Sequence, residues 1–510
     1  MSIELTTRNI GTGESFYDNY IEQGVDCDIT LPDYCPDIMR IIKCTLTSEI
    51  SNSKLIGDRA TADGNAKIRI VYTDEKNNIF CYDQDYPFSK YAELSTAYDD
   101  AFLCCSTKTE YVNCRAVSKR RIDVHGMVGL RFKVIGNKNI PLISDANGDG
   151  IQLRKKGLDI DNISGVTVKS FEISQVENVG DSNGGIGKII DAFASPILNE
   201  CKLIKGKILI KGELLVRVVY CSDTGGNEAC VLNCLLPFNE IAEAAAVTDN
   251  CKADVKMHVT RLTAEPKTDN DGEYRYMNIN AEVFAQLTVY EKTSVRIVTD
   301  AYSTDVDLSS EYSTMEFMQI SHDMKENILC KQSLDVSSMK PQKLYAFTIM
   351  HPEHRYRFDG DKVVISGKIP VNLIVIDSEG TPVLCEREAE FEYAKTVDSC
   401  DDLVLDPHVS IGGCSATLDT DGRVDFKAEV LLNGHLMKCS REKVLTSLSS
   451  QEGASEKNRK PAVVIYFCSE GESIWNIARK YNTTVEDIML ENDLTTDFVV
   501  NKHMLLIPVK

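Results

Sequence analysis

Three short stretches of the sequence hold residue types that could do chemistry. In "SDANGDGIQLRKK", Asp145, Asn147 and Asp149 stand at positions one, three and five of a calcium-binding loop. Such a loop needs a glutamate at position twelve that binds Ca²⁺ through both oxygens, and that position holds Lys156. The stretch therefore predicts a polar hairpin.

The second stretch, "SNGGIGKII", places Lys188 after Gly187 as a phosphate-binding loop does. In that loop a serine or threonine follows the lysine and binds Mg²⁺ through its hydroxyl. Here Ile189 follows, and Ser182 stands where the first glycine belongs. A linker is the better interpretation.

The third stretch, "HPEH", has His351 and His354 on either side of Glu353. Zinc proteases need two histidines on one face of a helix, and Pro352 disfavours a helix interior here. No G-x-S-x-G nucleophile elbow occurs either. We therefore expect a protein that is not an enzyme and has no catalytic residues, metal or cofactor.

Composition narrows the classes of partner. The 510 residues include 77 acidic and 56 basic side chains, a net charge of −21 that would repel nucleic acid and anionic lipid. No run of about 18 apolar residues is present, so we expect no membrane span. The start, "MSIELTTRNIGTGESF", lacks the features of a signal peptide. The 18 cysteines form no C-x-x-C pair, which favours reduced, mostly buried thiols in a cytoplasmic protein.

A threefold repeat extends over about the first 440 residues. Gly64, Gly212 and Gly367 each open a stretch with strand-like alternation, and they are 148 and 155 residues apart. A turn-forming cluster follows each stretch, and then an aromatic residue in "YPFSKYAE", "LPFNEIAE" and "EFEYAK". The repeat predicts three tandem β-rich domains.

Strands that are joined by Gly-, Asn- and Asp-rich turns favour antiparallel sandwiches or barrel-like sheets. We expect a mainly β protein with repeat domains at 1–155, 160–300 and 315–445. The segment "TSLSSQEGASEKNRKP", 446–461, has the composition of a flexible linker. A small separate domain is expected at 462–510.

The last segment predicts the order strand, helix, helix, strand. "VVIYFC" (Val463–Cys468) has the composition of a buried strand, and Ser473 can cap a helix with apolar residues at helical spacing. Thr484 and Asp487 form a capping pattern for a second helix that ends at Asn492. "MLLIP" then returns as a strand.

This segment resembles a LysM domain. The matching positions are Gly471, Glu472, Ser473, Ile474, Trp475, Ile477, Ala478, Asn492, Leu505, Ile507 and Pro508. The resemblance implies a groove for N-acetylglucosamine polymers between the loops Ser469–Ser473 and Asp493–His503. Acidic Glu470 and Glu472 flank that groove, whereas sugar recognition needs apolar faces and neutral donors, so we do not expect this copy to bind glycans.

The whole chain resembles the SipL family of clostridial spore-coat morphogenetic proteins, which have β-rich domains followed by one LysM domain. The resemblance implies a mother-cell cytoplasmic adaptor at the forespore surface, and later in the spore coat. It would bind the coat ATPase SpoIVA through its LysM domain and promote encasement of the forespore.

We expect the partner-binding residues of the LysM domain to be Trp475, Ile474, Val463, Glu472, Ser473 and Asn492. Other coat proteins and further copies of the chain are additional candidate partners. The alternative function is a LysM protein that binds peptidoglycan or N-acetylglucosamine polymers. A cell-wall hydrolase that is targeted by its LysM domain ranks third.

Overall fold

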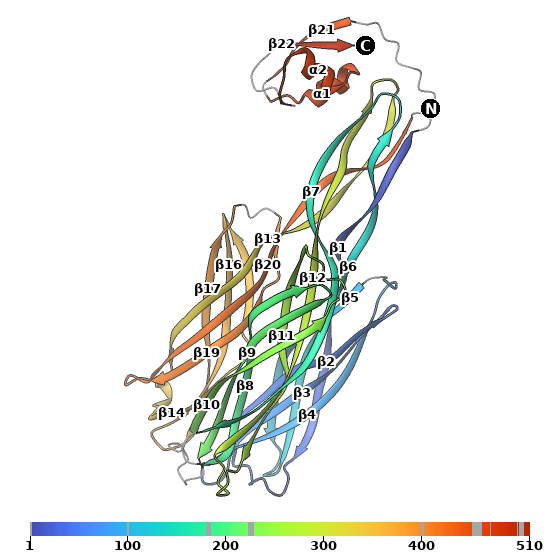
Figure 1. The fold of residues 1–510 in the computed structure, drawn as a ribbon. Helices are drawn as coiled ribbons and strands as arrows, with labels where there is room; N and C mark the ends of the chain where they lie inside the picture. Colours follow the sequence, from blue (N-terminus) through green and yellow to red (C-terminus); the bar gives the residue numbers. More distant parts are fainter. Residues whose placement is uncertain are drawn as a thin grey trace.

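The structure is a computed structural model that describes residues 3–98, 101–179, 185–222, 229–398, 402–450, 462–469, 471–496, 498 and 504–509. Within these residues the chain is mainly β-strand in several antiparallel sheets, as expected (Figure 1). None of the described sheets closes on itself. No helix in the described part of the chain is long and apolar enough to cross a membrane.

Three β units of the same plan follow one another. In the first unit, 4–147, the sheet order β1-β6-β5 faces the order β2-β3-β4. Its strands are β1 (Glu4–Thr30), β2 (Arg40–Ile56), β3 (Arg59–Thr73), β4 (Ile79–Glu93), β5 (Ala101–Ala116) and β6 (Arg121–Asn147).

The second unit, 151–303, repeats this plan with the orders β7-β12-β11 and β8-β9-β10. Its strands are β7 (Ile151–Asn178), β8 (Ile186–Ile204), β9 (Lys207–Ser222), β10 (Ala229–Glu243), β11 (Cys251–Lys267) and β12 (Tyr276–Ser303).

The third unit, 308–450, pairs β20 with β13, β18 and β19, and pairs β16 with β14, β15 and β17. Its elements are β13 (Leu308–Asp335), the 3₁₀ turn Ser337–Met339, β14 (Lys343–Ile349), β15 (Glu353–Asp359), β16 (Lys362–Ile376), β17 (Pro382–Thr396), β18 (Leu403–Leu405), β19 (His408–Leu418) and β20 (Arg423–Ser450).

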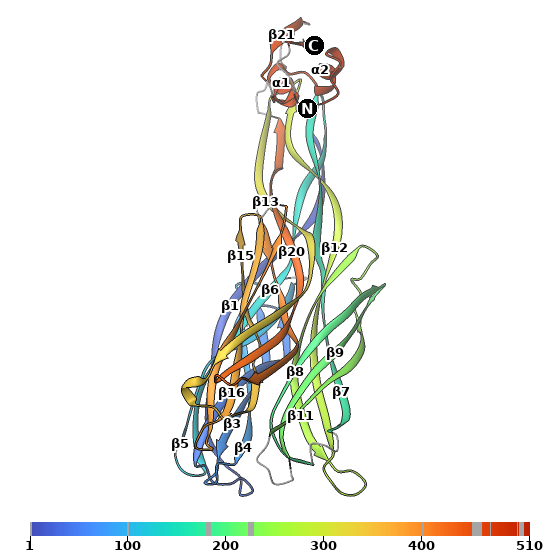
Figure 2. The same cartoon turned by 90° about the vertical axis from the view of Figure 1, so that its left-hand side faces the viewer.

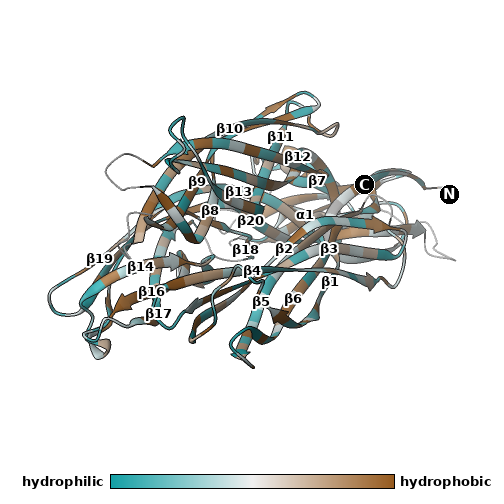
Figure 3. Ribbon diagram, turned by 90° about the horizontal axis from the view of Figure 1, so that it is seen from below, coloured by the Kyte–Doolittle hydropathy of each residue, from teal (hydrophilic) through white to brown (hydrophobic). Residues whose placement is uncertain are grey.

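Each unit has its own apolar core between its two sheets. The strands alternate between hydrophobic and hydrophilic residues, because successive side chains point to opposite faces of a sheet (Figure 3). The central strand β3 follows this rule, with buried residues at every second position along most of its length. A buried face on one side and a solvated face on the other therefore define each sheet.

The repeated glycine and aromatic of the sequence are cross-strand partners. Gly64 pairs with Phe88, Gly212 with Phe238 and Gly367 with Phe391. A Cβ added to Gly212 would lie 2.5 Å from the Phe238 ring and 2.1 Å from the carbonyl oxygen of Ile197. The ring therefore occupies the space that a side chain would need, which explains why glycine and phenylalanine recur together.

The longest strands extend beyond the sandwiches and form a stalk. The stalk consists of three two-stranded ribbons, β1 with β6, β7 with β12 and β13 with β20, which project together from one end of the body (Figures 1 and 2). Ile143, Val298 and Leu445 occupy equivalent positions in the three ribbons and are buried against one another. The stalk thus has a threefold apolar core of its own.

The structure corrects the start of the expected linker. Residues 446–450 belong to β20 and pair with the start of β13. Leu448 is buried in the stalk core, so this mostly polar stretch contributes an apolar side chain to that core. The rest of the expected linker, 451–461, lies outside the described residues.

The boundary between the first two repeat domains also differs from the expected one. β7 begins at Ile151, inside the expected first repeat domain. The division into independent domains stays a prediction.

The C-terminal unit has the expected order of elements. β21 (Ala462–Phe467) and β22 (Met504–Val509) pair antiparallel, with α1 (Ile474–Tyr481) and α2 (Val485–Glu491) between them in sequence. Both helices pack on one side of this two-stranded sheet through a small apolar core. The unit lies at the end of the stalk (Figures 1 and 2).

Candidate partner-binding site

The two helix starts of the C-terminal unit differ. Thr484 caps α2 as expected, because its hydroxyl accepts a hydrogen bond from the backbone N–H of Asp487 at 2.9 Å. Ser473 occupies the N-cap position of α1 as expected, but its side chain makes no capping hydrogen bond. The backbone carbonyl of Ser473 instead accepts from Asn476 and Ile477. Ser473 is buried and forms a β-bridge to Phe498.

Glu472 is held within its own loop. Its carboxylate accepts hydrogen bonds from the Tyr466 hydroxyl at 2.7 Å and from the Ser469 backbone N–H at 3.0 Å. The hydrogen bond to Glu472, together with burial, raises the pKa of Tyr466 to about 12. Glu472 therefore shapes the loop before α1. Glu470, the second acid expected to flank a sugar groove, lies outside the described residues.

Asn492 ties α2 to the sheet. Its amide nitrogen donates to the carbonyl oxygens of Ile488 and Leu506, and its amide oxygen accepts from the Leu506 N–H at 2.7 Å. These bonds satisfy backbone groups at the end of α2 and on β22. Asn492 thus supports the fold of the unit.

Trp475 faces the stalk. Its side chain is 7% exposed, and the indole N–H donates to Asp300 Oδ2 at 2.8 Å. Its ring meets the Tyr302 ring edge to face, with centroids 4.9 Å apart. The Tyr302 hydroxyl donates to the carbonyl oxygen of Thr483 at 2.7 Å. Its neighbour Ile474 is fully buried in the core of the unit.

Asp300, at the tip of β12, is the centre of this contact. It also accepts from the Tyr312 hydroxyl at 2.8 Å and pairs with Arg479 at 3.0 Å. Burial alone would raise the pKa of Asp300. The hydrogen bonds from Trp475 and Tyr312 and the charge of Arg479 outweigh burial, and the pKa lies below its usual value. The carboxylate is thus ionised where it holds α1.

The opposite side of the two-stranded sheet is open and apolar. We define the outer face as Val463, Ile465 and Phe467 of β21 together with Met504, Leu506 and Pro508 of β22. These residues form three directly opposed pairs. The side chains of Val463, Ile465, Phe467 and Met504 are 59%, 57%, 77% and 54% exposed. A contiguous apolar patch of this kind is typical of an interaction site.

The expectation of a buried strand at Val463–Cys468 is therefore wrong for alternate residues. Both helices cover the same face of the sheet, and among the residues that the structure describes no other element covers its second face. Of the six expected partner-binding residues, the structure places Val463 on the outer face. Ile474, Trp475 and Ser473 are buried, and Glu472 and Asn492 bond within the unit.

Comparison with known families finds matches in the first two β units and in the C-terminal unit. The family model described as SipL, SPOCS domain matches residues 37–117 and 185–267, and the LysM domain model matches 469–508. The chain contains SipL-type SPOCS domains and a C-terminal LysM domain. The two SPOCS matches cover β2 to β5 and β8 to β11, the corresponding parts of the first two units. A search of the curated proteins and a search of the solved structures gave no match.

The SPOCS and LysM matches support a sporulation-related, SipL-like protein. SPOCS and LysM domains are non-catalytic binding or adaptor domains, and no enzymatic family matched. In the part of the chain that the structure describes, no group of three or more His, Cys, Asp or Glu side chains is arranged to hold a metal ion. His351 lies in the short connection before β15, and His354 lies within that strand.

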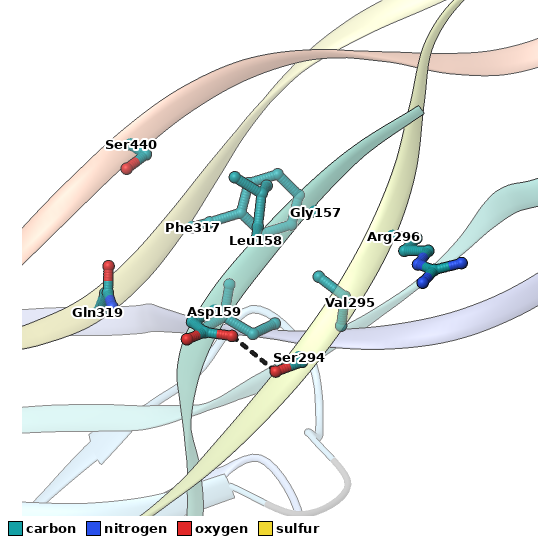
Figure 4. Close-up of a pocket in the computed structure, with 10 residues that line it drawn as sticks. Gly157, Leu158, Asp159, Ser294, Val295, Arg296, Phe317, Gln319 and Ser440 are labelled. Atoms are coloured by element: carbon teal, nitrogen blue, oxygen red, sulfur yellow. Dashed lines mark hydrogen bonds between the residues drawn. The ribbon is translucent and has the colours of Figure 1, made fainter. Parts of the chain in front are cut away.

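An open hollow of about 540 Å³ lies between the second and third ribbons, beside Phe317 of β13 (Figure 4). One carboxylate, that of Asp159, lines the hollow. It accepts a hydrogen bond from Ser294 and forms an ion pair with Lys292 at 2.9 Å. The charge of Asp159 is thus neutralised by its neighbours. The other charged side chain among the lining residues is Arg296, and an arginine is not suited to act as a general base, so the hollow offers no general acid–base pair.

The sequence interpretation missed Asp300 and Tyr302. Neither residue belongs to the LysM segment, and each stands in an ordinary strand pattern. An alignment of the three repeats could have pointed to Tyr302. The equivalent positions in the first and third units hold the polar residues Asn147 and Ser449, so an aromatic residue there is specific to the second unit.

Proposed function

We propose that this chain is a non-enzymatic adaptor of spore coat assembly that binds the coat ATPase SpoIVA through its LysM domain. It acts at the forespore surface from the mother-cell cytoplasm and promotes encasement by the coat. The SPOCS and LysM matches support the adaptor class. The observation that carries the choice of surface is the exposed outer face at the end of the stalk.

The contact with SpoIVA is made by the outer face. Phe467 supplies an exposed aromatic ring, a residue type that is enriched at protein interfaces, and Ile465 and Val463 extend the apolar surface beside it. The opposite face of the LysM domain is occupied by Asp300 and Tyr302. Ile474, Trp475, Ser473, Glu472 and Asn492 then act by maintaining the shape and placement of the domain.

Calorimetric titration of the full chain with purified SpoIVA tests this proposal. The double variant Ile465→Ser, Phe467→Ser should weaken binding at least about tenfold, as expected for loss of interface anchors. Leu490→Ser is the matched control, because Leu490 is 82% exposed on α2, away from the outer face. Equal binding by both variants and the wild type would overturn the choice of surface.

A parallel titration with N-acetylglucosamine oligomers tests the alternative function. We expect no heat of binding to the sugar at concentrations where SpoIVA saturates the chain. Heat of binding to the sugar, together with no heat of binding to SpoIVA, would establish the glycan-binding alternative. In sporulating cells, the double variant should leave fluorescent coat proteins as a cap at the forespore instead of a full shell.

A further inference from the structure

We propose that Cys44 and Cys114 are a matched thiol pair that forms a disulfide between the two sheets of the first unit when the folded protein meets a disulfide oxidant such as oxidised glutathione. The two residues lie on β2 and β5, which belong to different sheets. The bond would fasten the sandwich of the SPOCS-matched segment 37–117.

Strand register places two cysteines on the inner face of one sheet. Cys27 of β1 and Cys114 of β5 both pair with Val124 of the central strand β6. Directly opposed residues in an antiparallel sheet point to the same side. Val124 is fully buried in the core of the first unit, so both cysteines also point into the space between the sheets.

The facing sheet brings Cys44 over this row. A Cβ added to Gly126 of β6 would lie 2.8 Å from Leu46 Cδ2, so the Leu46 side chain reaches across to the row of Gly126. Cys44 stands two residues before Leu46 on the same face of β2, and Val124 stands two residues before Gly126 on β6. Cys44 therefore faces the row that contains Cys27, Val124 and Cys114.

The contact itself selects Cys114 as the partner of Cys44. The two side chains are hydrogen-bonded to each other, and the hydrogen bond from Cys44 lowers the pKa of Cys114 despite burial. Burial, followed by the nearby carboxylates of Asp26, Asp123 and Asp28, raises the pKa of Cys27. The interaction with Cys44 thus favours the thiolate form of Cys114, and Cys114 is partly exposed to reagents.

The reaction is a two-step thiol–disulfide exchange. The Cys114 thiolate attacks one sulfur of oxidised glutathione, which gives a mixed disulfide and releases one glutathione thiolate. Cys44 then loses its proton to solvent and attacks the Cys114 sulfur, which releases the second glutathione. Two protein thiols are oxidised to one disulfide, and one molecule of oxidised glutathione is reduced to two thiols.

The test is to incubate the folded full chain with oxidised glutathione, block free thiols with N-ethylmaleimide and map the digest without reduction. We expect a cross-linked peptide that contains Cys44 and Cys114, and an intact mass that lacks two maleimide groups. The cross-link should persist in Cys27→Ser. A Cys27–Cys44 cross-link in the wild type, or retention of all thiols, would overturn the proposal.

A stability readout separates this pair from incidental oxidation. The bond would close a long loop between residues 44 and 114, so oxidation should raise the melting temperature of the wild type by about 5–10 °C. Cys44→Ala and Cys114→Ala should show no such rise on oxidation, whereas Cys35→Ala, a buried cysteine of the same core, should keep it. An equal rise in Cys44→Ala and the wild type would also contradict the pairing.

Discussion

The tips of the first and second ribbons have the same backbone conformation, but their aspartates bind different partners. Each has a bulge at a hydroxyl residue, Ser144 or Thr299, whose side chain donates to a carbonyl of the opposite strand. An aspartate follows each bulge. Asp145 pairs with Lys155 of the neighbouring strand at 2.9 Å, whereas Asp300 accepts from Trp475 of the LysM domain.

The third ribbon has the same bulge at Thr446 but a serine, Ser447, in place of the aspartate. The three ribbon tips therefore have similar backbones, and their side chains determine which tip contacts the LysM domain. The second ribbon combines a carboxylate at 300 with an aromatic ring at 302. The difference teaches that the three ribbons share one backbone, and that Asp300 together with Tyr302 makes the second ribbon the docking position.

The largest effect on this docking is expected from Tyr302→Ala. The change removes the ring that packs on Trp475 and the hydrogen bond to Thr483, a loss of about 2–4 kcal/mol. Trp475 is the one tryptophan in the chain, so its emission should shift to the red and become easier to quench. Asn147→Ala, at the equivalent position of the first ribbon, should leave the emission unchanged. Unaltered fluorescence in Tyr302→Ala would refute the docking contact.

A smaller loss of docking free energy is expected from Asp300→Ala. Without the carboxylate, the buried indole N–H of Trp475 loses its acceptor, at a cost of about 1–3 kcal/mol. Acrylamide quenching of Trp475 should increase. Asp145→Ala tests the other side of the comparison and should leave quenching at the wild-type level. Equal quenching in the two variants would mean that Asp300 contributes nothing specific.

Acid should weaken the same contact. Because the pKa of Asp300 is lowered in the docked state, its contribution is fully present above the ordinary carboxyl pKa of about 4 and is lost as pH falls through the lowered value. The Trp475 emission of the wild type should shift to the red in that acidic range. Asp300→Asn should show no shift of its own there, and a wild-type emission that is flat down to acid unfolding would contradict the assignment.

The smallest effect is expected from Arg479→Ala. Arg479 is 51% exposed, so its ion pair with Asp300 is largely screened by solvent and contributes about 1 kcal/mol or less. Added salt should reduce the difference in quenching between this variant and the wild type. If Arg479→Ala weakened the docking as much as Tyr302→Ala does, charge and not packing would dominate the contact.

Local patterns in the sequence were enough to predict much of the fold. Alternating apolar residues and turn clusters predicted the antiparallel sheets, because strand periodicity depends on neighbouring residues alone. The repeated Gly212 and Phe238, with their counterparts, marked the three units before their pairing was known. Thr484 and Asp487 predicted the start of α2 for the same reason, since a helix cap spans a few residues.

The sequence by itself thus determined the strands, the LysM fold and the surplus of acidic side chains. Tertiary structure decided which faces are used. Trp475 was expected to meet a partner, but it meets Asp300, 175 residues away, and Val463 lies instead on the open face. The reason is physical: whether an apolar side chain is free depends on which distant element packs against it, and no local pattern contains that information.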